Sequence, residues 1–128
     1  MKKILFVCVE NSNRSQMAEA FAKIHGKDKV EVYSSGSKPS GIINPKAIAA
    51  MKELGYDLTK HDSKSLEQIP KIKYDYAITM GCGDECPFVM ATHREDWKLD
   101  DPKHMDVTEF NKVRDEIEQR VIKLIGKL

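Results

Sequence analysis

The chain has 128 residues, 41% of them hydrophobic and 32% charged, and its formal net charge is +1. This length and composition predict a single globular domain over residues 1–128, with a buried core. The small net charge argues against nucleic acid or an acidic membrane surface as a partner, and no apolar stretch is long enough to span a membrane.

The chain begins with a basic pair and an apolar run, which together imitate a secretory signal. The apolar run stops at Glu10, which is too early for that role, and no small-residue cleavage site follows it. We interpret residues 3–8 as a strand buried on both faces of a sheet. Without an export signal the protein is expected in the cytoplasm, where its three cysteines would be free thiols.

A short polar loop between a cysteine and an arginine follows this strand and precedes a helical pattern. In such a strand-to-helix turn the backbone N–H groups converge on one point, where a tetrahedral oxyanion binds with help from the helix N-terminus. Arg14 would close this cradle with its guanidinium, and Cys8 would lie in a positive field that favours its thiolate, the nucleophile. The residues expected to bind the oxyanion are Val9, Glu10, Asn11, Ser12, Asn13 and Arg14. A structural turn with a buried cysteine is the alternative.

Helices are predicted directly after the cradle and at two further places. Apolar residues at helical spacing mark residues 15–26, which Gly26 ends, and a second helix that begins after the N-cap Asn44 and ends at Gly55. The chain closes with a long amphipathic helix from Val107 onward, because apolar residues there recur every three or four positions.

Strands alternate with these helices, which predicts an α/β fold: a four-stranded parallel sheet with helices on both faces. The expected strands after the first cover residues 30–34, 74–80 and 94–97, and one short helical turn is expected at residues 65–69. In such sheets the active site lies at the carboxyl ends of the strands. Cys8 ends the first strand and Cys82 follows the third, so both thiols would open onto one crevice if these strands are neighbours.

Two cysteines lie in a glycine-rich loop after the third predicted strand. We favour a redox pair, in which Cys82 attacks a modified Cys8 and Cys86 then attacks the resulting disulfide. Two other interpretations stay open: solvent-facing thiols without a role, and half of a zinc site completed by histidines such as His93 or His104. No standard spacing of cysteine and histidine supports zinc, and we expect neither a metal nor a cofactor.

An Asp-Asp-Pro segment lies late in the chain. A carboxyl group over the cradle could donate a proton to a departing oxygen, and Pro102 keeps Asp100 or Asp101 out of a helix. An ordinary turn before a helix is an equal alternative. The four histidines lack any motif context, so we expect them at the surface or in satisfied core positions.

Taken together, these residues resemble the low-molecular-weight protein tyrosine phosphatase superfamily, and within it the thioredoxin-coupled arsenate reductases. The similarity covers essentially the whole chain. The segments that carry it, in family order, are the cradle with Arg14–Glu19, Tyr33–Gly36, Asn44–Ile48, the pair Cys82 and Cys86, and Trp97–Pro102. The cradle alone would indicate only the superfamily.

The resemblance implies a low-molecular-weight phosphatase-like fold and the reduction of arsenate to arsenite. Cys8 would be the nucleophile that takes arsenate, Arg14 would bind the oxyanion and Ser15 would stabilise the thiolate. Asn11 would hold the shape of the loop, and Asp101 would be the general acid. Because arsenate and phosphate have the same charge and shape, the cradle would bind both.

The redox outcome implied by the resemblance comes from the other two thiols. Cys82 would release arsenite by forming a disulfide with Cys8, and Cys86 would form a disulfide with Cys82 that thioredoxin reduces. Only three residues separate Cys82 from Cys86, fewer than these reductases usually have, and a related branch uses glutaredoxin. The expected partner is therefore thioredoxin or a glutaredoxin-type reductant, and the protein is expected to act as a monomer.

Two positions depart from the pattern of the resembled family. Asn13 stands where a cysteine is common. Asn11, Glu19 and Ser34 match the side chains of a monovalent-cation site near the cradle, but Lys64 stands where an aspartate is usual. An ammonium group there would replace the ion, so we expect no bound potassium.

Two other functions remain as alternatives. A low-molecular-weight protein tyrosine phosphatase would use Cys8, Arg14 and Asp101 to hydrolyse phosphomonoesters through a Cys8 phosphoenzyme. Such phosphatases usually carry aromatic residues where this chain has Lys38–Ser40 and Lys103–His104, so no aromatic platform is evident. A non-catalytic anion-binding module would not need this complete set of nucleophile and acid.

Overall fold

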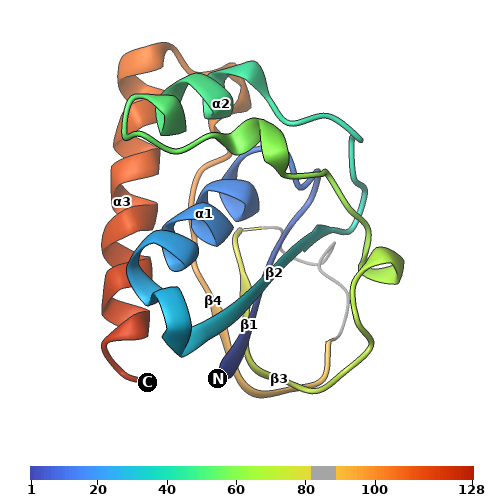
Figure 1. The fold of residues 1–128 in the computed structure, drawn as a ribbon. Helices are drawn as coiled ribbons and strands as arrows, with labels where there is room; N and C mark the ends of the chain where they lie inside the picture. Colours follow the sequence, from blue (N-terminus) through green and yellow to red (C-terminus); the bar gives the residue numbers. More distant parts are fainter. Residues whose placement is uncertain (82–88) are drawn as a thin grey trace.

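A four-stranded parallel sheet organises the computed structural model, which describes residues 1–81 and 89–128 (Figure 1). The strands are β1 (Lys2–Cys8), β2 (Val30–Gly36), β3 (Tyr74–Thr79) and β4 (Ala91–Asp96). Their order in the sheet is β2-β1-β3-β4, and each pairing is parallel. The predicted parallel sheet is confirmed, and so is the adjacency of the first and third strands. β4 begins earlier than predicted and ends at Asp96, one residue short of the prediction.

Three α-helices of the described residues connect and cover these strands. The helices are α1 (Arg14–Gly26), α2 (Pro45–Lys52) and α3 (Val107–Ile125), with short 3-10 helices η1 (Lys27–Lys29), η2 (Leu58–Lys60), η3 (Leu66–Gln68) and η5 (Pro102–His104). The first and last predicted helices are confirmed, and the expected short turn is η3. The second ends at Lys52 rather than Gly55, because residues 53–55 form a turn. Of these helices, none is long and apolar enough to cross a membrane.

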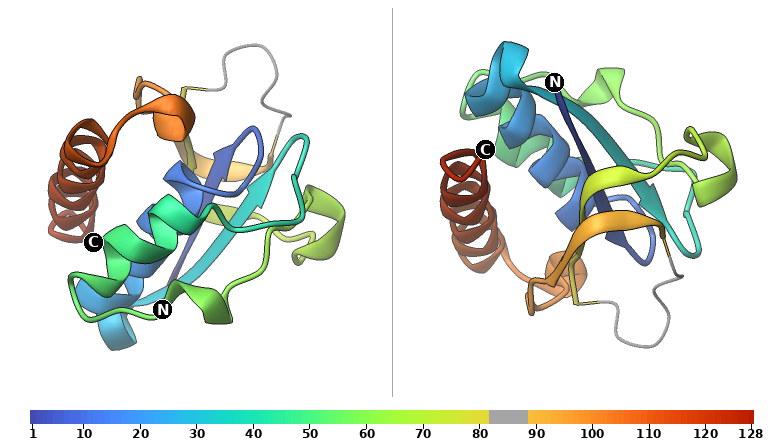
Figure 2. Two further views of the ribbon diagram at one scale, coloured as in Figure 1. Left: turned by 90° about the horizontal axis from the view of Figure 1, so that it is seen from above. Right: turned by 90° about the horizontal axis from the view of Figure 1, so that it is seen from below.

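The two faces of the sheet are covered unequally. Alternate residues of β1 point to opposite faces. Ile4 and Phe6 face the larger core, which the three α-helices complete, whereas Leu5 and Val7 face a smaller cluster that includes Leu66 of η3. Figure 2 shows the three α-helices on one side of the sheet and η3 on the other. Helices therefore lie on both faces, as predicted, with a short 3-10 helix as the helical cover of the second face.

Local sequence signals explain where the helices begin. The Asn44 side chain accepts a hydrogen bond from the N–H of Lys46 at 2.9 Å, and Pro45 is the first helical residue, so the predicted N-cap is confirmed. Asp106 caps α3 in a similar way, through the N–H of Glu109 at 2.9 Å. Each cap satisfies an N–H group that the helix itself leaves unpaired.

The carboxyl ends of all four strands meet at one edge of the sheet. Cys8 at the end of β1 lies opposite Gly36 of β2, and Val7 lies opposite Thr79 of β3. Thr79 is in turn opposite Asp96 of β4. The segments that follow these strands therefore start next to one another, and the loop after β1 starts between the ends of β2 and β3.

Gly26 ends α1 as predicted, and its missing side chain matters for packing. A Cβ atom at this position would lie 2.4 Å from Val30 Cγ2 and 3.2 Å from Ile125 Cδ1. Both neighbours are buried, and the branched Val30 side chain has little rotational freedom to move away. The close approach of α1, β2 and α3 therefore depends on a glycine here.

Gly26→Ala is expected to lower the free energy of unfolding by about 1–3 kcal/mol, because the added methyl group overpacks this junction. Gly126→Ala is the matched control: its Cβ would meet its nearest neighbours at 3.5 Å, and its backbone is helical. That control is expected to change stability by less than about 1 kcal/mol. Urea denaturation measures both variants, and a Gly26→Ala protein as stable as the wild type would contradict the packing argument.

Candidate functional site

The loop of residues 9–13 joins β1 to α1 and encloses the sulfur of Cys8. Cys8 is buried, with 3% of its surface exposed. The N–H of Asn11 donates to Cys8 Sγ at 3.3 Å, and Ser15 Oγ lies 2.9 Å from the same sulfur. The side-chain amide of Asn11 donates to Ser15 Oγ at 2.7 Å, which leaves the hydroxyl proton of Ser15 for the sulfur. Two donors therefore converge on Cys8 Sγ, an arrangement that can stabilise a thiolate.

Carbonyl groups of Cys8 and of this loop point outward, where they accept hydrogen bonds from backbone N–H groups of another segment. The hydrogen bonds run from Ser37 N to Cys8 O (3.1 Å), from Lys38 N to Val9 O (2.8 Å), from Ser40 N to Glu10 O (3.1 Å) and from Asn44 N to Ser12 O (3.2 Å). Within a planar trans peptide group the C=O and the N–H point in opposite directions. The N–H groups that follow these carbonyls therefore face the inside of the loop, as an oxyanion cradle requires.

Asn11 fixes the shape of the loop through its backbone conformation and its side-chain hydrogen bonds. Its φ of 52° is left-handed, a conformation that asparagine tolerates better than most residues. Its Oδ1 accepts hydrogen bonds from Gln16 Nε2 at 2.8 Å and from the N–H of Lys64 at 2.7 Å. Gly36 lets β2 approach the loop closely, since a Cβ there would lie 2.5 Å from Val9 O and 2.9 Å from Asn11 N.

Arg14 begins α1, and its buried guanidinium is held by backbone from two other segments. Nη1 donates to the carbonyls of Met80 at 2.6 Å and of Leu99 at 3.2 Å. Gly81, with φ of 78°, makes room for it: a Cβ there would lie 3.1 Å from Nη1. Nη2 lies 3.8 Å from Asp101 Oδ2. The donors on Nε and Nη2 are thus the ones that can reach an oxyanion.

Asp101 is the carboxylate that the structure pairs with Arg14. Its side chain is 49% exposed, and it caps η5 by accepting a hydrogen bond from the N–H of Lys103 at 3.0 Å. Asp100 is exposed, and no described contact joins it to the cradle. Of the two aspartates that the sequence leaves open, Asp101 is the one whose carboxylate lies beside Arg14, and its role as the general acid stays a prediction.

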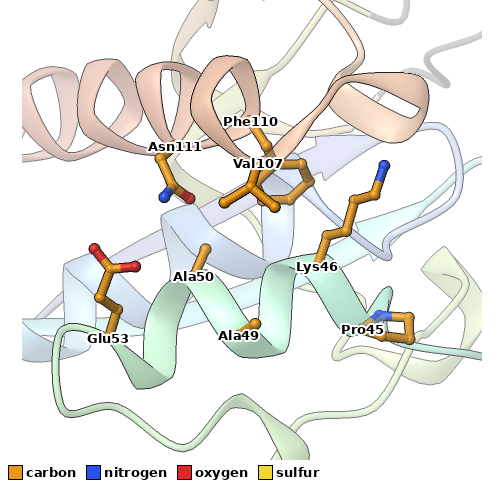
Figure 3. Close-up of a pocket in the computed structure, with 8 residues that line it drawn as sticks. All are labelled: Pro45, Lys46, Ala49, Ala50, Glu53, Val107, Phe110 and Asn111. Carbon is orange, nitrogen blue, oxygen red and sulfur yellow. The ribbon is translucent and has the colours of Figure 1, made fainter.

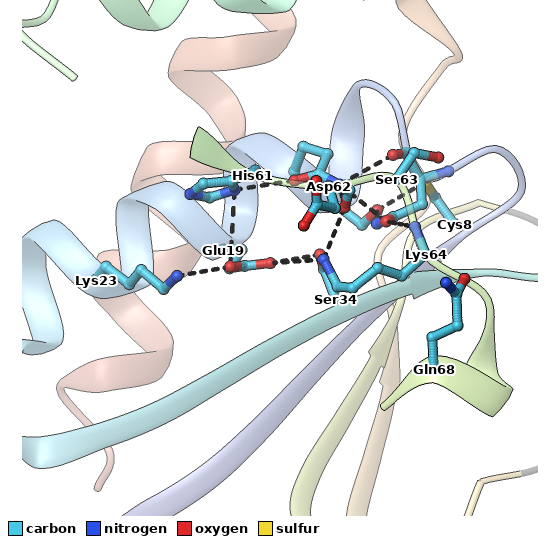
Figure 4. Close-up of polar contacts among 12 residues, drawn as sticks. Cys8, Glu19, Lys23, Ser34, His61, Asp62, Ser63, Lys64 and Gln68 are labelled. Carbon is cyan, nitrogen blue, oxygen red and sulfur yellow. Dashed lines mark hydrogen bonds and ion pairs between the residues drawn. The ribbon is translucent and has the colours of Figure 1, made fainter. Parts of the chain in front are cut away.

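A buried polar cluster lies next to the cradle (Figure 4). His61 Nδ1 lies 2.9 Å from Gln16 Oε1, and His61 Nε2 lies 2.6 Å from the hydroxyl of Tyr56. Because the amide oxygen of Gln16 can only accept, the neutral imidazole carries its proton on Nδ1. His61 meets the expectation of a satisfied core histidine, but its link to the cradle through Gln16 and Asn11 is one that sequence reasoning missed.

Glu19 and His61 share this cluster and influence each other's titration. Glu19 accepts hydrogen bonds from Lys23, at 2.7 Å, and from Ser34, and it lies 3.7 Å from His61 Nδ1 (Figure 4). Burial acts to raise the pKa of Glu19, but these hydrogen bonds and the neighbouring positive charges outweigh it and lower the pKa. Burial also lowers the pKa of His61, against the opposing attraction of Glu19. At neutral pH, Glu19 is therefore charged and His61 neutral.

Lys64 contributes an ammonium group to the same cluster. Its Nζ lies 4.0 Å from Glu19 Oε1 and donates to the carbonyl of Asp62 at 2.7 Å. The ammonium thus lies beside Glu19, one of the three residues that match a cation site. Within residues 1–81 and 89–128, no group of three or more His, Cys, Asp or Glu could hold a metal ion. That potassium does not bind here stays a prediction.

Cys82 and Cys86 lie outside the described residues, so their disulfide exchange with Cys8 stays a prediction. The residue that precedes Cys82 is described. Gly81 lies against Arg14 and Leu99, as the close approach at its Cβ position shows. Gly81 therefore forms part of the wall of the cradle.

A separate hollow of about 260 Å³ opens between α2 and α3 (Figure 3). Its lining consists of Pro45, Lys46, Ala49, Ala50, Glu53, Val107, Phe110 and Asn111. No residue of this lining belongs to the cradle loop or to the buried cluster, so we do not assign the chemistry to this hollow.

The chain is similar to known proteins over its whole length. Residues 3–128 match the family described as low molecular weight phosphotyrosine protein phosphatase. A glutaredoxin arsenate reductase from Synechocystis sp. is 42% identical over 131 residues, which cover 100% of this chain and 99% of that protein. Arsenate reductase 1 from Staphylococcus epidermidis is 43% identical, covering 94% and 92%. A solved arsenate reductase in the phosphate binding state superimposes with a TM-score of 0.89 at 42% identity, covering 99% and 98%.

Two substitutions of Asn11 separate its hydrogen bonds from its backbone conformation. Asn11→Gly removes the side-chain bonds but keeps the left-handed conformation accessible, whereas Asn11→Ala removes both. Both variants are expected to weaken the binding of inorganic phosphate, and Asn11→Ala is expected to be less stable than Asn11→Gly by about 1 kcal/mol. Calorimetric titration and urea denaturation measure these effects. Phosphate binding as tight as in the wild type would show that Asn11 does not shape the loop.

The lowered pKa of His61 predicts a pH-dependent stability. Its ordinary value is 6.5, so the folded chain binds fewer protons there than the unfolded chain does as the pH falls. At pH values above its ordinary pKa, neutral His61 contributes to the stability of the fold. This contribution is lost as the pH falls through the lower pKa that His61 has in the folded chain. From about pH 7 to about pH 5 the Tm of His61→Gln is expected to fall less than that of the wild type. The exposed His104→Gln is the control, and identical Tm profiles for all three proteins would contradict the assignment.

Proposed function

Because the chain belongs to the low molecular weight phosphotyrosine protein phosphatase family, we propose that it reduces arsenate to arsenite in the cradle around Cys8. Relatives of similar length are named arsenate reductases, which supports this reaction. The observation that carries the proposal is the arrangement at Cys8: the N–H of Asn11 and the hydroxyl of Ser15 contact a buried sulfur, and the loop around that sulfur leads directly into Arg14. Two further cysteines follow closely after Gly81, a residue in the wall of the same cradle.

The first step forms a bond between sulfur and arsenic. A bound arsenate ion accepts hydrogen bonds from the loop N–H groups and from Nε and Nη2 of Arg14. The Cys8 thiolate, stabilised by Ser15, attacks the arsenic atom, so that an S–As bond forms and an As–O bond breaks. Asp101 donates a proton to the departing oxygen, which leaves as water. Arsenic is still pentavalent at this point.

The second and third steps are the redox chemistry. The Cys82 thiolate attacks Cys8 Sγ, an S–S bond forms, and the S–As bond breaks with its electron pair left on arsenic, which departs as trivalent arsenite. The Cys86 thiolate then attacks Cys82 Sγ, which releases the Cys8 thiolate and leaves a Cys82–Cys86 disulfide. In the sequence Cys82 directly follows Gly81, the residue beside Arg14, which supports a role for Cys82 in this step.

A dithiol protein of the thioredoxin type returns two electrons to the Cys82–Cys86 disulfide. A glutaredoxin-type reductant is the second candidate, favoured by the name of the Synechocystis relative. The relay needs thiols that stay reduced between turnovers, so we place the protein in the cytoplasm. We further propose that it acts as a monomer.

Phosphomonoester hydrolysis is the second candidate function, favoured by the description of the family. It shares the first step, and water rather than Cys82 would then attack the Cys8 phosphoenzyme. No aromatic side chain occurs at Lys38–Ser40 or at Lys103–His104 to hold a phenyl ring. Phosphatase activity is therefore expected only as a slower side reaction.

One turnover of arsenate without reductant tests the relay. Mass spectrometry is expected to find a Cys82–Cys86 disulfide in the wild type, because the last exchange leaves the oxidation there. Cys86→Ser is expected to accumulate a Cys8–Cys82 disulfide instead, since its final exchange is blocked. Cys8→Ser is expected to release no arsenite with any reductant.

Parallel assays with thioredoxin and with glutaredoxin plus glutathione identify the electron donor from the rate of arsenite release. Full thioredoxin-coupled turnover by Cys86→Ser would reject the three-thiol relay. Hydrolysis of a phosphotyrosine peptide at a rate far above that of arsenate reduction would reverse the order of the two candidate functions.

A further inference from the structure

Glu10 is an unexpected residue for a loop that binds an anion. Its backbone N–H faces the inside of the cradle, yet its carboxylate has the same sign of charge as arsenate or phosphate. Lys103 Nζ donates to Glu10 Oε2 at 2.9 Å and to Oε1 at 3.2 Å. The side chains of Glu10 and Lys103 are 30% and 45% exposed. Both carboxylate oxygens are therefore paired with one ammonium group in a partly exposed position.

This ion pair joins the cradle to the acid segment. Lys103 follows Asp101 by two residues, and its N–H donates to Asp101 Oδ1 at 3.0 Å. Asp101 Oδ2 in turn lies 3.8 Å from Arg14 Nη2. These ion pairs join two segments at both ends: the loop from Glu10 to Arg14 and the segment from Asp101 to Lys103. The segments and their contacts form a closed ring, which we call the mouth of the cradle.

The Glu10–Lys103 pair differs from an ordinary surface pair of the same chain. Lys112 and Glu109 pair at 3.1 Å within one helix, with both side chains more than half exposed, and such pairs constrain little. Glu10 and Lys103 are 93 residues apart, one in the loop after β1 and the other in η5, so their contact holds these two segments together. The hydrogen bond to Glu10 raises the pKa of Lys103, which therefore stays charged at neutral pH.

We propose that the Glu10–Lys103 pair is a clasp that restricts the cradle to small inorganic oxyanions. The inference rests on the proposed function and deepens it, because it names what selects the substrate class. An inorganic arsenate or phosphate ion carries only oxygen on its central atom and has no group that must extend beyond the ring. An ester must project its organic group past Asp101, the group that protonates the leaving oxygen, and therefore across the clasp.

Charge gives the clasp a second effect. Lys103 neutralises Glu10, whose free carboxylate would repel an anion from the loop. Loss of Lys103 alone therefore opens the mouth but leaves a negative charge beside the bound anion. Replacement of both residues by neutral ones opens the mouth without that charge, so a double variant separates the steric effect from the electrostatic one.

The test compares the Kd of inorganic phosphate with that of phenylphosphonate, which carries a ring in place of one oxygen and is not hydrolysed. The wild type is expected to prefer phosphate. In E10Q/K103A, the ratio of the phenylphosphonate Kd to the phosphate Kd is expected to fall about tenfold. K103A alone is expected to weaken phosphate binding about threefold. K103R, which keeps the pair, and K112A, which removes the ordinary pair on α3, are expected to retain the wild-type preference.

Hydrolysis of p-nitrophenyl phosphate gives a second readout, and its kcat/KM is expected to rise in E10Q/K103A. An unchanged ratio of the two Kd values in this variant, with its circular dichroism spectrum like that of the wild type, would overturn the clasp. The binding ratio does not depend on the reductase assay. A wild-type protein that fails to reduce arsenate would reject the proposed function, whereas the ratio of Kd values decides on the clasp in either case.

Discussion

The orientation of the peptide groups in the loop after β1 is the constraint on which the rest of the structure depends. Several N–H groups must share one concave side, although buried backbone groups are normally paired. Here the N–H groups of the segment after β2 donate hydrogen bonds to the loop carbonyls, and Gly36 lets that segment approach closely enough to do so. β2 therefore helps to build the site through its backbone, although none of the residues assigned to the reaction lies on it. The parallel order of the sheet places that backbone beside Cys8.

The charges around the cradle are balanced in a way that leaves its positive field intact. Glu10 is paired with Lys103, and Glu19 is paired with Lys23 at 2.7 Å and with Lys64 at 4.0 Å. Neither carboxylate therefore cancels the guanidinium of Arg14 or the positive end of α1. Among the described residues, the carboxylate that pairs with Arg14 is that of Asp101, to which we assign the chemical role of the acid, and at 3.8 Å it is no tight pair. The electrostatics thus favour an incoming anion despite the acidic residues close to it.

Local patterns in the sequence predict the scaffold and the centre of the site, and long-range contacts complete it. The apolar run at residues 3–8 and the cap at Asn44 act within a few residues, so the sequence reveals them. His61 lies in a stretch without helical or strand periodicity, and its partner Gln16 is 45 residues away, so nothing local marks it as buried. The choice of Asp101 over its neighbour depends on the path of the chain after β4, which hydrophobic patterns do not determine.

The hydrogen bonds that Arg14 donates to two backbone carbonyls have a thermodynamic consequence. A long arginine side chain that becomes ordered loses rotamer freedom equivalent to about 1.5–2 kcal/mol. Because Met80 and Leu99 hold the guanidinium, that loss takes place when the chain folds and not when a ligand arrives. Capture of an anion is therefore not weakened by immobilising its main cation. The entropy of ordering this side chain is therefore a term in folding, where the two hydrogen bonds to Met80 and Leu99 offset it, and a single side chain links affinity at this loop to the stability of the fold.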